Sequence, residues 1–334
     1  MADRELPHPD LTGTDLTGKD LPDRRILFVH AHPDDETINN GATMARYAAG
    51  GAHVTLVTCT RGEQGEVIPE QLRHLSAEQE DRLGGHRVGE LAEAMVALGV
   101  TDHRFLDAAG TRADGSAVHY RDSGMTFDEN HQITLPADAR PDAFARADLD
   151  EAAGLLADVI VELRPQVVVT YEPGGGYGHP DHVQAHRVTM HAVELAAQRG
   201  AGDGFSDDGA SGWQVPKVYW IVVPETLMKL ALEAMAGSPD NPFEAWSSGP
   251  LPSMVVPDEL VTSAIDGSAY LDRKTAALRA HATQIAVDGP FFALSNGIGA
   301  PLASTEFYRL VQGVAAGPRD DAGRETDLFA GTVA

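Results

Sequence analysis

Hydrophobic residues along this chain form two patterns: short unbroken runs, and longer segments in which apolar positions recur every three or four residues. Short runs are typical of strands buried on both faces of a parallel sheet, and the periodic segments are typical of amphipathic helices. The runs predict strands at 25–30, 52–60, 103–106, 166–171 and 218–223, with short strand-like pieces in 251–265. The periodic segments predict helices at 37–49, 76–98, 149–163, 183–198, 225–235 and 272–285.

This alternation of strand and helix determines the expected fold class. A strand, a helix and a second strand between residues 25 and 60 make a βαβ unit, which implies parallel pairing and a right-handed crossover. We therefore predict an α/β fold: a Rossmann-like layered sheet, mostly parallel, with helices on both faces and an elaborated C-terminal part. No Gly-x-Gly-x-x-Gly pattern follows the first strand, so nothing in that turn indicates a dinucleotide.

Three segments show no clear periodicity. Residues 1–23 are rich in Asp, Gly, Thr and Pro, and we expect a disordered leader there followed by one domain over 24–334. Residues 107–142 form a long polar segment, and loops of that length in compact domains are often functional. Residues 200–212 have the Gly, Asp and Ser content of a linker or excursion.

The net charge and the cysteine content indicate which partners and which cellular compartment to expect. The net charge of -25 and the pI near 4.7 would repel phosphate backbones and anionic membrane surfaces, so we expect neither nucleic acid nor membrane as a partner. The leader lacks the apolar stretch of a signal peptide. The single cysteine, Cys59, sits in an apolar run and fits a buried core position in a reducing compartment. We expect a cytoplasmic protein.

Candidate chemistry gathers where two of the predicted strands end. The first run stops in Ala-His-Pro-Asp-Asp-Glu at 31–36, and the fourth is followed by Gly-His-Pro-Asp-His at 178–182. Open α/β sheets keep their functional sites at the carboxyl ends of their strands, so we expect one site built from both clusters. A third His-Pro-Asp, at 8–10, has no strand before it, which shows that the tripeptide alone is weak evidence.

The two clusters contain donors for a metal ion. Catalytic zinc usually takes three protein ligands and keeps one position for water, and both His nitrogen and Asp oxygen are suitable donors. We predict that His32, Asp35 and His182 bind one zinc ion per subunit, although iron(II) accepts the same set. His186, four residues after His182 on the same helix face, is an alternative ligand.

The remaining polar residues of the clusters suggest a hydrolytic mechanism. Asp34, beside a ligand but expected to point elsewhere, is the candidate general base. His179 could stabilise an oxyanion or protonate a leaving amine, and Asp181 could orient an imidazole. Tyr177, which follows three glycines, could donate its hydroxyl to the same developing charge.

These motifs resemble those of the zinc-dependent N-acetylglucosaminyl deacetylases of the LmbE-like (PIG-L) superfamily, whose hallmarks are Ala-His-Pro-Asp-Asp-Glu and a later His-Pro-Asp-His. The resemblance implies that residues 24–334 are a single LmbE-like domain. It also supports the metal set and Asp34 as the base. Further matching segments are Asn40-Gly41-Ala42-Thr43, Gly62-Glu63-Gln64-Gly65-Glu66-Val67-Ile68, Leu83-Gly84-Gly85-His86-Arg87, Arg121-Asp122-Ser123-Gly124-Met125, His281-Ala282-Thr283-Gln284 and Glu325-Thr326-Asp327-Leu328.

Within this family the chain looks similar to the deacetylases of mycothiol biosynthesis. That resemblance implies hydrolysis of N-acetylglucosaminyl-inositol, a small pseudodisaccharide, to glucosaminyl-inositol and acetate. It further implies that Arg87 and Asp122 hold the sugar and inositol hydroxyls, and that the loop through Glu66 lines the same pocket.

Three other functions are weighed against this one. The nearest is mycothiol S-conjugate amidase, which uses the same metal chemistry on a larger acyl group. A non-haem iron oxygenase also uses two histidines and a carboxylate, but those sites usually lie in β-barrels, whereas this chain is expected to be α/β. A non-catalytic sugar-binding module is the third alternative, and it would not need Asp34 beside the metal.

Overall fold

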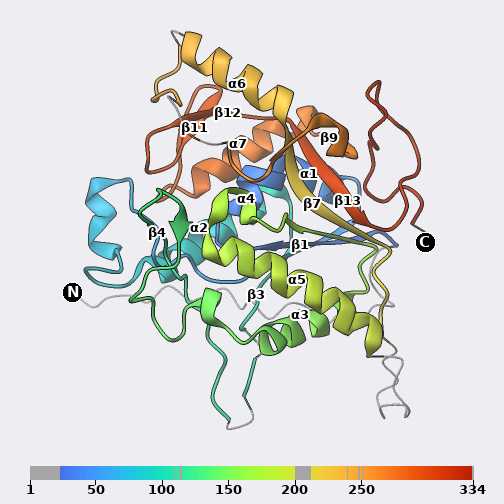
Figure 1. The fold of residues 1–334 in the computed structure, drawn as a ribbon, viewed down its shortest axis with the longest axis horizontal. Helices are drawn as coiled ribbons and strands as arrows, with labels where there is room; N and C mark the ends of the chain where they lie inside the picture. Colours follow the sequence, from blue (N-terminus) through green and yellow to red (C-terminus); the bar gives the residue numbers. More distant parts are fainter. Residues whose placement is uncertain are drawn as a thin grey trace.

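The centre of the fold is an eight-stranded sheet. The computed structural model describes residues 23–332 apart from 109, 113–114, 200–211, 239, 247–248 and 250. The strands of the sheet are β1 (Arg25–His30), β2 (His53–Thr58), β3 (Asp102–Phe105), β6 (Val167–Tyr171), β7 (Lys217–Pro224), β8 (Val255–Val256), β9 (Ser263–Asp266) and β13 (Thr305–Gln312). Their order is β3-β2-β1-β6-β7-β13-β9, with β8 paired to β7 (Figure 1).

The predicted mostly parallel sheet is confirmed. Strands β3, β2, β1, β6 and β7 run parallel, and β13 and β9 join the far side in antiparallel fashion. Chain order proceeds from β1 outward through β2 to β3, whereas β6 lies on the opposite side of β1. This reversal makes the carboxyl ends of β1 and β6 a switch point, where the loops after the two strands diverge and leave room for a site.

Helices cover both faces of the sheet, as predicted. Along β1, Leu27 and Val29 belong to the core that packs on α3 and α5, and Ile26 and Phe28 to the core beneath α1, α2 and α7. Because all four side chains of Ile26–Val29 enter one core or the other, this part of the strand is an unbroken apolar run. The helices are α1 (Asp35–Ala49), α2 (Leu83–Leu98), α3 (Leu149–Leu163), α5 (Pro180–Gln198), α6 (Glu225–Gly237) and α7 (Leu271–Ala280).

Several short strands and helices lie in the segments that connect these elements. The long polar segment 107–142 contains one small hairpin, and the C-terminal part adds a three-stranded sheet beside α6 (Figure 1). The short strands are β4 (Thr126–Phe127), β5 (Ile133–Thr134), β10 (Ala286–Asp288), β11 (Phe291–Ala293) and β12 (Gly299–Pro301). The short helices are α4 (Gly175–Gly178), η1 (Glu70–Leu75), η2 (Phe144–Arg146), η3 (Asp258–Leu260) and η4 (Ser268–Tyr270).

Two predicted helix boundaries are wrong. The expected start at Ser76 is instead a turn, in which the Gln79 amide donates to the Ser76 carbonyl, and α2 begins at Leu83. Residues 76–82 have no apolar side chain larger than alanine, so a helix there would have no face to bury. The helix expected over 272–285 ends at Ala280, because residues 281–284 turn toward the site.

Some predictions fall outside the part of the chain that the structure describes. Residues 1–22 of the expected leader and 200–211 of the expected linker are not among the described residues. The description of 24–334 as one domain stays a prediction. Within the described ranges, no helix has both the length and the apolar character needed to cross a bilayer.

Candidate active site

Three side-chain atoms from the two His-Pro-Asp loops face one another at the switch point. Nδ1 of His32 lies 3.2 Å from Oδ2 of Asp35 and 3.2 Å from Nε2 of His182, and the last two atoms are 3.3 Å apart. Tetrahedral zinc with bonds of about 2.0–2.1 Å holds its ligand atoms about 3.3 Å apart. The spacing of this predicted set therefore fits a single metal ion.

Hydrogen bonds behind the two imidazoles direct their lone pairs toward that point. Nδ1 of His182 lies 3.1 Å from the Gly175 carbonyl, and Nε2 of His32 lies 3.2 Å from an Asp181 carboxylate oxygen. Since both partners only accept, these nitrogens carry the protons, and the nitrogens facing the site are left as ligands. Asp181 thus contacts the imidazole of His32, and its orienting role stays a prediction.

The electrostatics of the cluster favour a cation. Burial lowers the pKa of His32, but the carboxylates of Asp122, Asp181 and Asp35 outweigh burial and raise that pKa well above its ordinary value. All four side chains are buried. A buried group of acceptors that draws a proton this strongly is also suited to a metal ion.

Asp34 lies beside the ligand triangle and is not part of it. Its backbone has φ of 117°, and its carboxylate accepts a 2.9 Å hydrogen bond from Arg87. Burial raises the pKa of Asp34 to about 6, against the opposing charge of Arg87. A carboxylate with such a pKa can exchange a proton near neutral pH, as a general base must.

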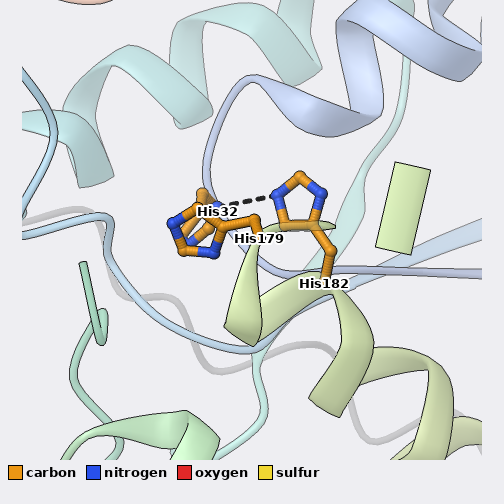
Figure 2. A group of neighbouring side chains, drawn as sticks. All are labelled: His32, His179 and His182. Atoms are coloured by element: carbon orange, nitrogen blue, oxygen red, sulfur yellow. Dashed lines mark hydrogen bonds between the residues drawn. The ribbon is translucent and has the colours of Figure 1, made fainter. Parts of the chain in front are cut away.

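His179 and Tyr177 complete the wall of the site. The ring centroid of His179 lies 4.7 Å from that of His32 and 5.0 Å from that of His182. Figure 2 shows the three imidazoles together. Nδ1 of His179 accepts from the Asp181 amide, so the neutral ring carries its proton on Nε2. Tyr177 is 41% exposed, and its ring centroid is 5.0 Å from that of His182.

The residues expected to bind substrate occupy different depths. Asp122, from the long polar loop, is buried with Oδ1 3.5 Å from Nε2 of His32. Arg87 is buried behind Asp34 and also donates to the carbonyls of Gly62 and Pro33. Glu66 is exposed in the loop after β2. Their contacts with a sugar stay predictions.

The alternative ligand His186 does not face the cluster. Its Nδ1 pairs with the Tyr171 carbonyl at 2.9 Å, and its ring lies against Trp220. Within the described residues, the other donor sets close enough to hold an ion combine His32 either with His179 and His182 or with Asp122 and Asp181. Every such arrangement is centred on His32.

Three further residues of the site lie in the motifs described above but had no predicted role. The Ser123 amide and hydroxyl both donate to the Asp181 carboxylate, the amide at 2.8 Å. Glu36 accepts from the Asp34 amide, and His281 pairs with Glu36. What could have indicated all three is that they lie in motifs shared with the deacetylases. Spacing in the sequence does not show that His281 contacts Glu36.

Half of the chain, including both clusters, matches a known protein family. Residues 27–193, half of the chain, match the family described as PIG-L, GlcNAc-PI de-N-acetylase. The matched stretch contains both strand-end clusters and all three atoms of the ligand triangle. The chain belongs to the PIG-L family.

Relatives within the PIG-L family cover nearly the whole chain. A protein of Kribbella flavida is 56% identical over 93% of this chain and 99% of its own, and one of Geodermatophilus obscurus is 54% identical over 93% and 98%. Both are named 1D-myo-inositol 2-acetamido-2-deoxy-alpha-D-glucopyranoside deacetylase. A 4-carboxy-2-hydroxymuconate hydratase from Pseudomonas putida shares the fold, with a TM-score of 0.50 at 17% identity over 89% of this chain and 100% of that one.

Proposed function

We propose that this PIG-L family protein hydrolyses the N-acetyl group of N-acetylglucosaminyl-inositol to give glucosaminyl-inositol and acetate, a step of mycothiol biosynthesis. The observation that carries the proposal is a triangle of three candidate ligand atoms, 3.2–3.3 Å apart, beside the buried Asp34 carboxylate, whose pKa burial raises to about 6. The substrate comes from the shared name of relatives that are more than half identical over 93% of the chain.

We propose one zinc ion per subunit, held by His32, Asp35 and His182. Two imidazole nitrogens and one carboxylate oxygen suit zinc, and iron(II) is the alternative because it accepts the same donors. A metal ion bound there would polarise the amide carbonyl and lower the pKa of water.

The chain's own residues supply the proton transfers. Asp34 accepts a proton from the water that attacks the acetyl carbon. As the C–N bond breaks, the leaving amine takes up one proton, either from the now protonated Asp34 carboxyl or from Nε2–H of His179. Nε2–H of His179 donates to the carbonyl oxygen as negative charge develops on it, and the Tyr177 hydroxyl adds a second donor from the rim. Asp181 acts through His32, whose ring it orients.

Substrate contacts and surroundings complete the proposal. We assign Asp122, Arg87 and Glu66 to the sugar and inositol hydroxyls, with Arg87 also holding Asp34. A cytoplasmic location is supported by the single cysteine, Cys59, which is fully buried. The net charge of -25 argues against nucleic-acid and membrane partners.

The test is release of primary amine from N-acetylglucosaminyl-inositol by the purified protein. We expect release that stops on chelation and returns with zinc, with iron(II) added in parallel to compare the two metals. A mycothiol S-conjugate serves as the competing substrate. Faster turnover of the conjugate would replace the deacetylase assignment by the amidase, and no release from either would refute metal-dependent amide hydrolysis.

A further inference from the structure

A buried pair of residues lies directly behind Asp34, and the mechanism above does not use it. Nε2 of His281 is 2.9 Å from Oε1 of Glu36, and both side chains are 0% exposed. Glu36 follows the ligand Asp35 at the start of α1, whereas His281 comes just after α7, 245 residues later in the chain. The contact therefore joins the C-terminal part to the turn that carries the base.

The other oxygen of Glu36 holds the backbone of Asp34. Oε2 of Glu36 accepts from the Asp34 amide at 2.9 Å. Asp34 needs such support because its φ of 117° and ψ of -36° lie outside the regions that L-residues ordinarily adopt. Its side chain makes no capping bond to α1, which leaves the carboxylate to Arg87 and the site. Strain of this kind persists where surrounding contacts enforce it.

The segment around His281 makes a second contact near Asp34, through Thr283. The amide and hydroxyl of Thr283 donate to the two carboxylate oxygens of Glu90, at 2.8 Å and 2.7 Å. Glu90 lies three residues after Arg87 on α2. The turn that ends α7 is thus tied both to the helix bearing the partner of Asp34 and, through Glu36, to Asp34 itself.

His281 makes this contact at a cost. Its Nδ1 is buried and has no hydrogen-bond partner among the described residues. A buried ring nitrogen without a partner is unfavourable for stability, and natural proteins keep such features chiefly at functional sites. Simple anchoring of α1 to the C-terminal part is already supplied by another buried pair, Lys274 with Glu306, whose carboxylate also accepts from two α1 amides.

We propose that His281 is a positioning residue for the deacetylation: by fixing Glu36, it holds the strained backbone of Asp34 so that its carboxylate points at the reacting centre. This inference rests on the proposed function, in which Asp34 is the base. It assigns no contact between His281 and the substrate or the metal. Loss of the pair should therefore slow the chemical step without weakening substrate binding.

Three variants of the full-length protein test the inference. His281→Leu removes the donor to Glu36, His281→Gln keeps an N–H donor near the same place, and Lys274→Met breaks the anchoring pair at α1 as a matched control. For each variant we would measure kcat, KM, bound metal per chain and Tm.

We expect His281→Leu to lower kcat by about 10–100-fold with KM within about twofold, because a misplacement of ~1 Å at a reacting group costs up to about 100-fold. His281→Gln should recover most of the loss. Lys274→Met should lower Tm by at least as much as His281→Leu while kcat stays within about threefold. Metal content should stay near that of the unsubstituted protein in all three.

The outcomes separate this inference from the proposed function. An unsubstituted protein that releases no amine refutes the function itself, whatever the variants do. If that protein is active, an unchanged kcat in His281→Leu overturns the inference, and so does a kcat loss shared with Lys274→Met or accompanied by metal loss. If His281→Leu fails to fold, His281→Asn replaces it, because its shorter side chain stays polar but cannot span the 2.9 Å contact from Nε2 to Oε1 of Glu36; a kcat within about twofold would then overturn the inference.

Discussion

Replacement of Asp34 by asparagine is the sharpest test of the proposed chemistry. Asparagine has the same shape, keeps an oxygen for the 2.9 Å bond from Arg87, and tolerates positive φ better than other non-glycine residues. The variant should therefore fold with its strained turn intact. The oxygen and nitrogen atoms of the ligand triangle come from His32, Asp35 and His182, so metal content should also be unchanged.

The expected loss follows from what the amide cannot do. Asp34 has a pKa of about 6 because burial raises it, so it is mostly ionised at neutral pH and ready to accept a proton. An amide accepts none, and removal of a positioned general base costs about 10²–10⁴-fold in kcat. That range corresponds to ~3–5 kcal/mol of transition-state stabilisation. Donors such as Nε2–H of His179 remain, so activity should not vanish completely.

The assay measures kcat for amine release together with metal per chain. In the unsubstituted protein, kcat/KM should be highest above about pH 6 and should fall as pH drops through the pKa of Asp34, because only the carboxylate form accepts a proton. Asp34→Asn should lack that dependence. If the variant keeps more than about a tenth of the activity with metal bound, Asp34 is not the base.

The remaining predictions concern the ligands, the oxyanion donor and one buried ion pair. Elemental analysis should show that His182→Ala loses most of its bound metal, whereas His186→Ala keeps it. If His182→Ala keeps the metal and His186→Ala loses it, His186 is the ligand in place of His182. His179→Ala should lower kcat about 10²–10³-fold with metal retained, and a change confined to KM would argue for a binding role instead. Lys217→Met should destabilise the protein by ~3–5 kcal/mol in chemical unfolding, because it leaves the fully buried carboxylate of Glu325 without its 2.7 Å ion pair; a loss under about 1 kcal/mol would contradict this.

The strand that ends in the first cluster shows what could be predicted well. Each residue of Ile26–Val29 is buried on one face of the sheet or the other, and this produces an apolar run that admits few other interpretations. Strand β13 was missed because its composition is mixed. Its Glu306 and Tyr308 face the interior as polar groups that bond to α1 residues, whereas pattern reasoning assigns polar residues to solvent.

The layered α/β fold, the location of the site at the switch point and the residues predicted to bind its metal could all be inferred from the sequence, because these features depend on local periodicity and on short motifs at strand ends. The contacts that support the site became visible only in the folded chain. The bonds from Arg87 to Asp34, from Ser123 to Asp181 and from His281 to Glu36 join positions 53 to 245 residues apart. No local pattern encodes such pairings, since they exist only once the sheet and its helices have brought distant segments together.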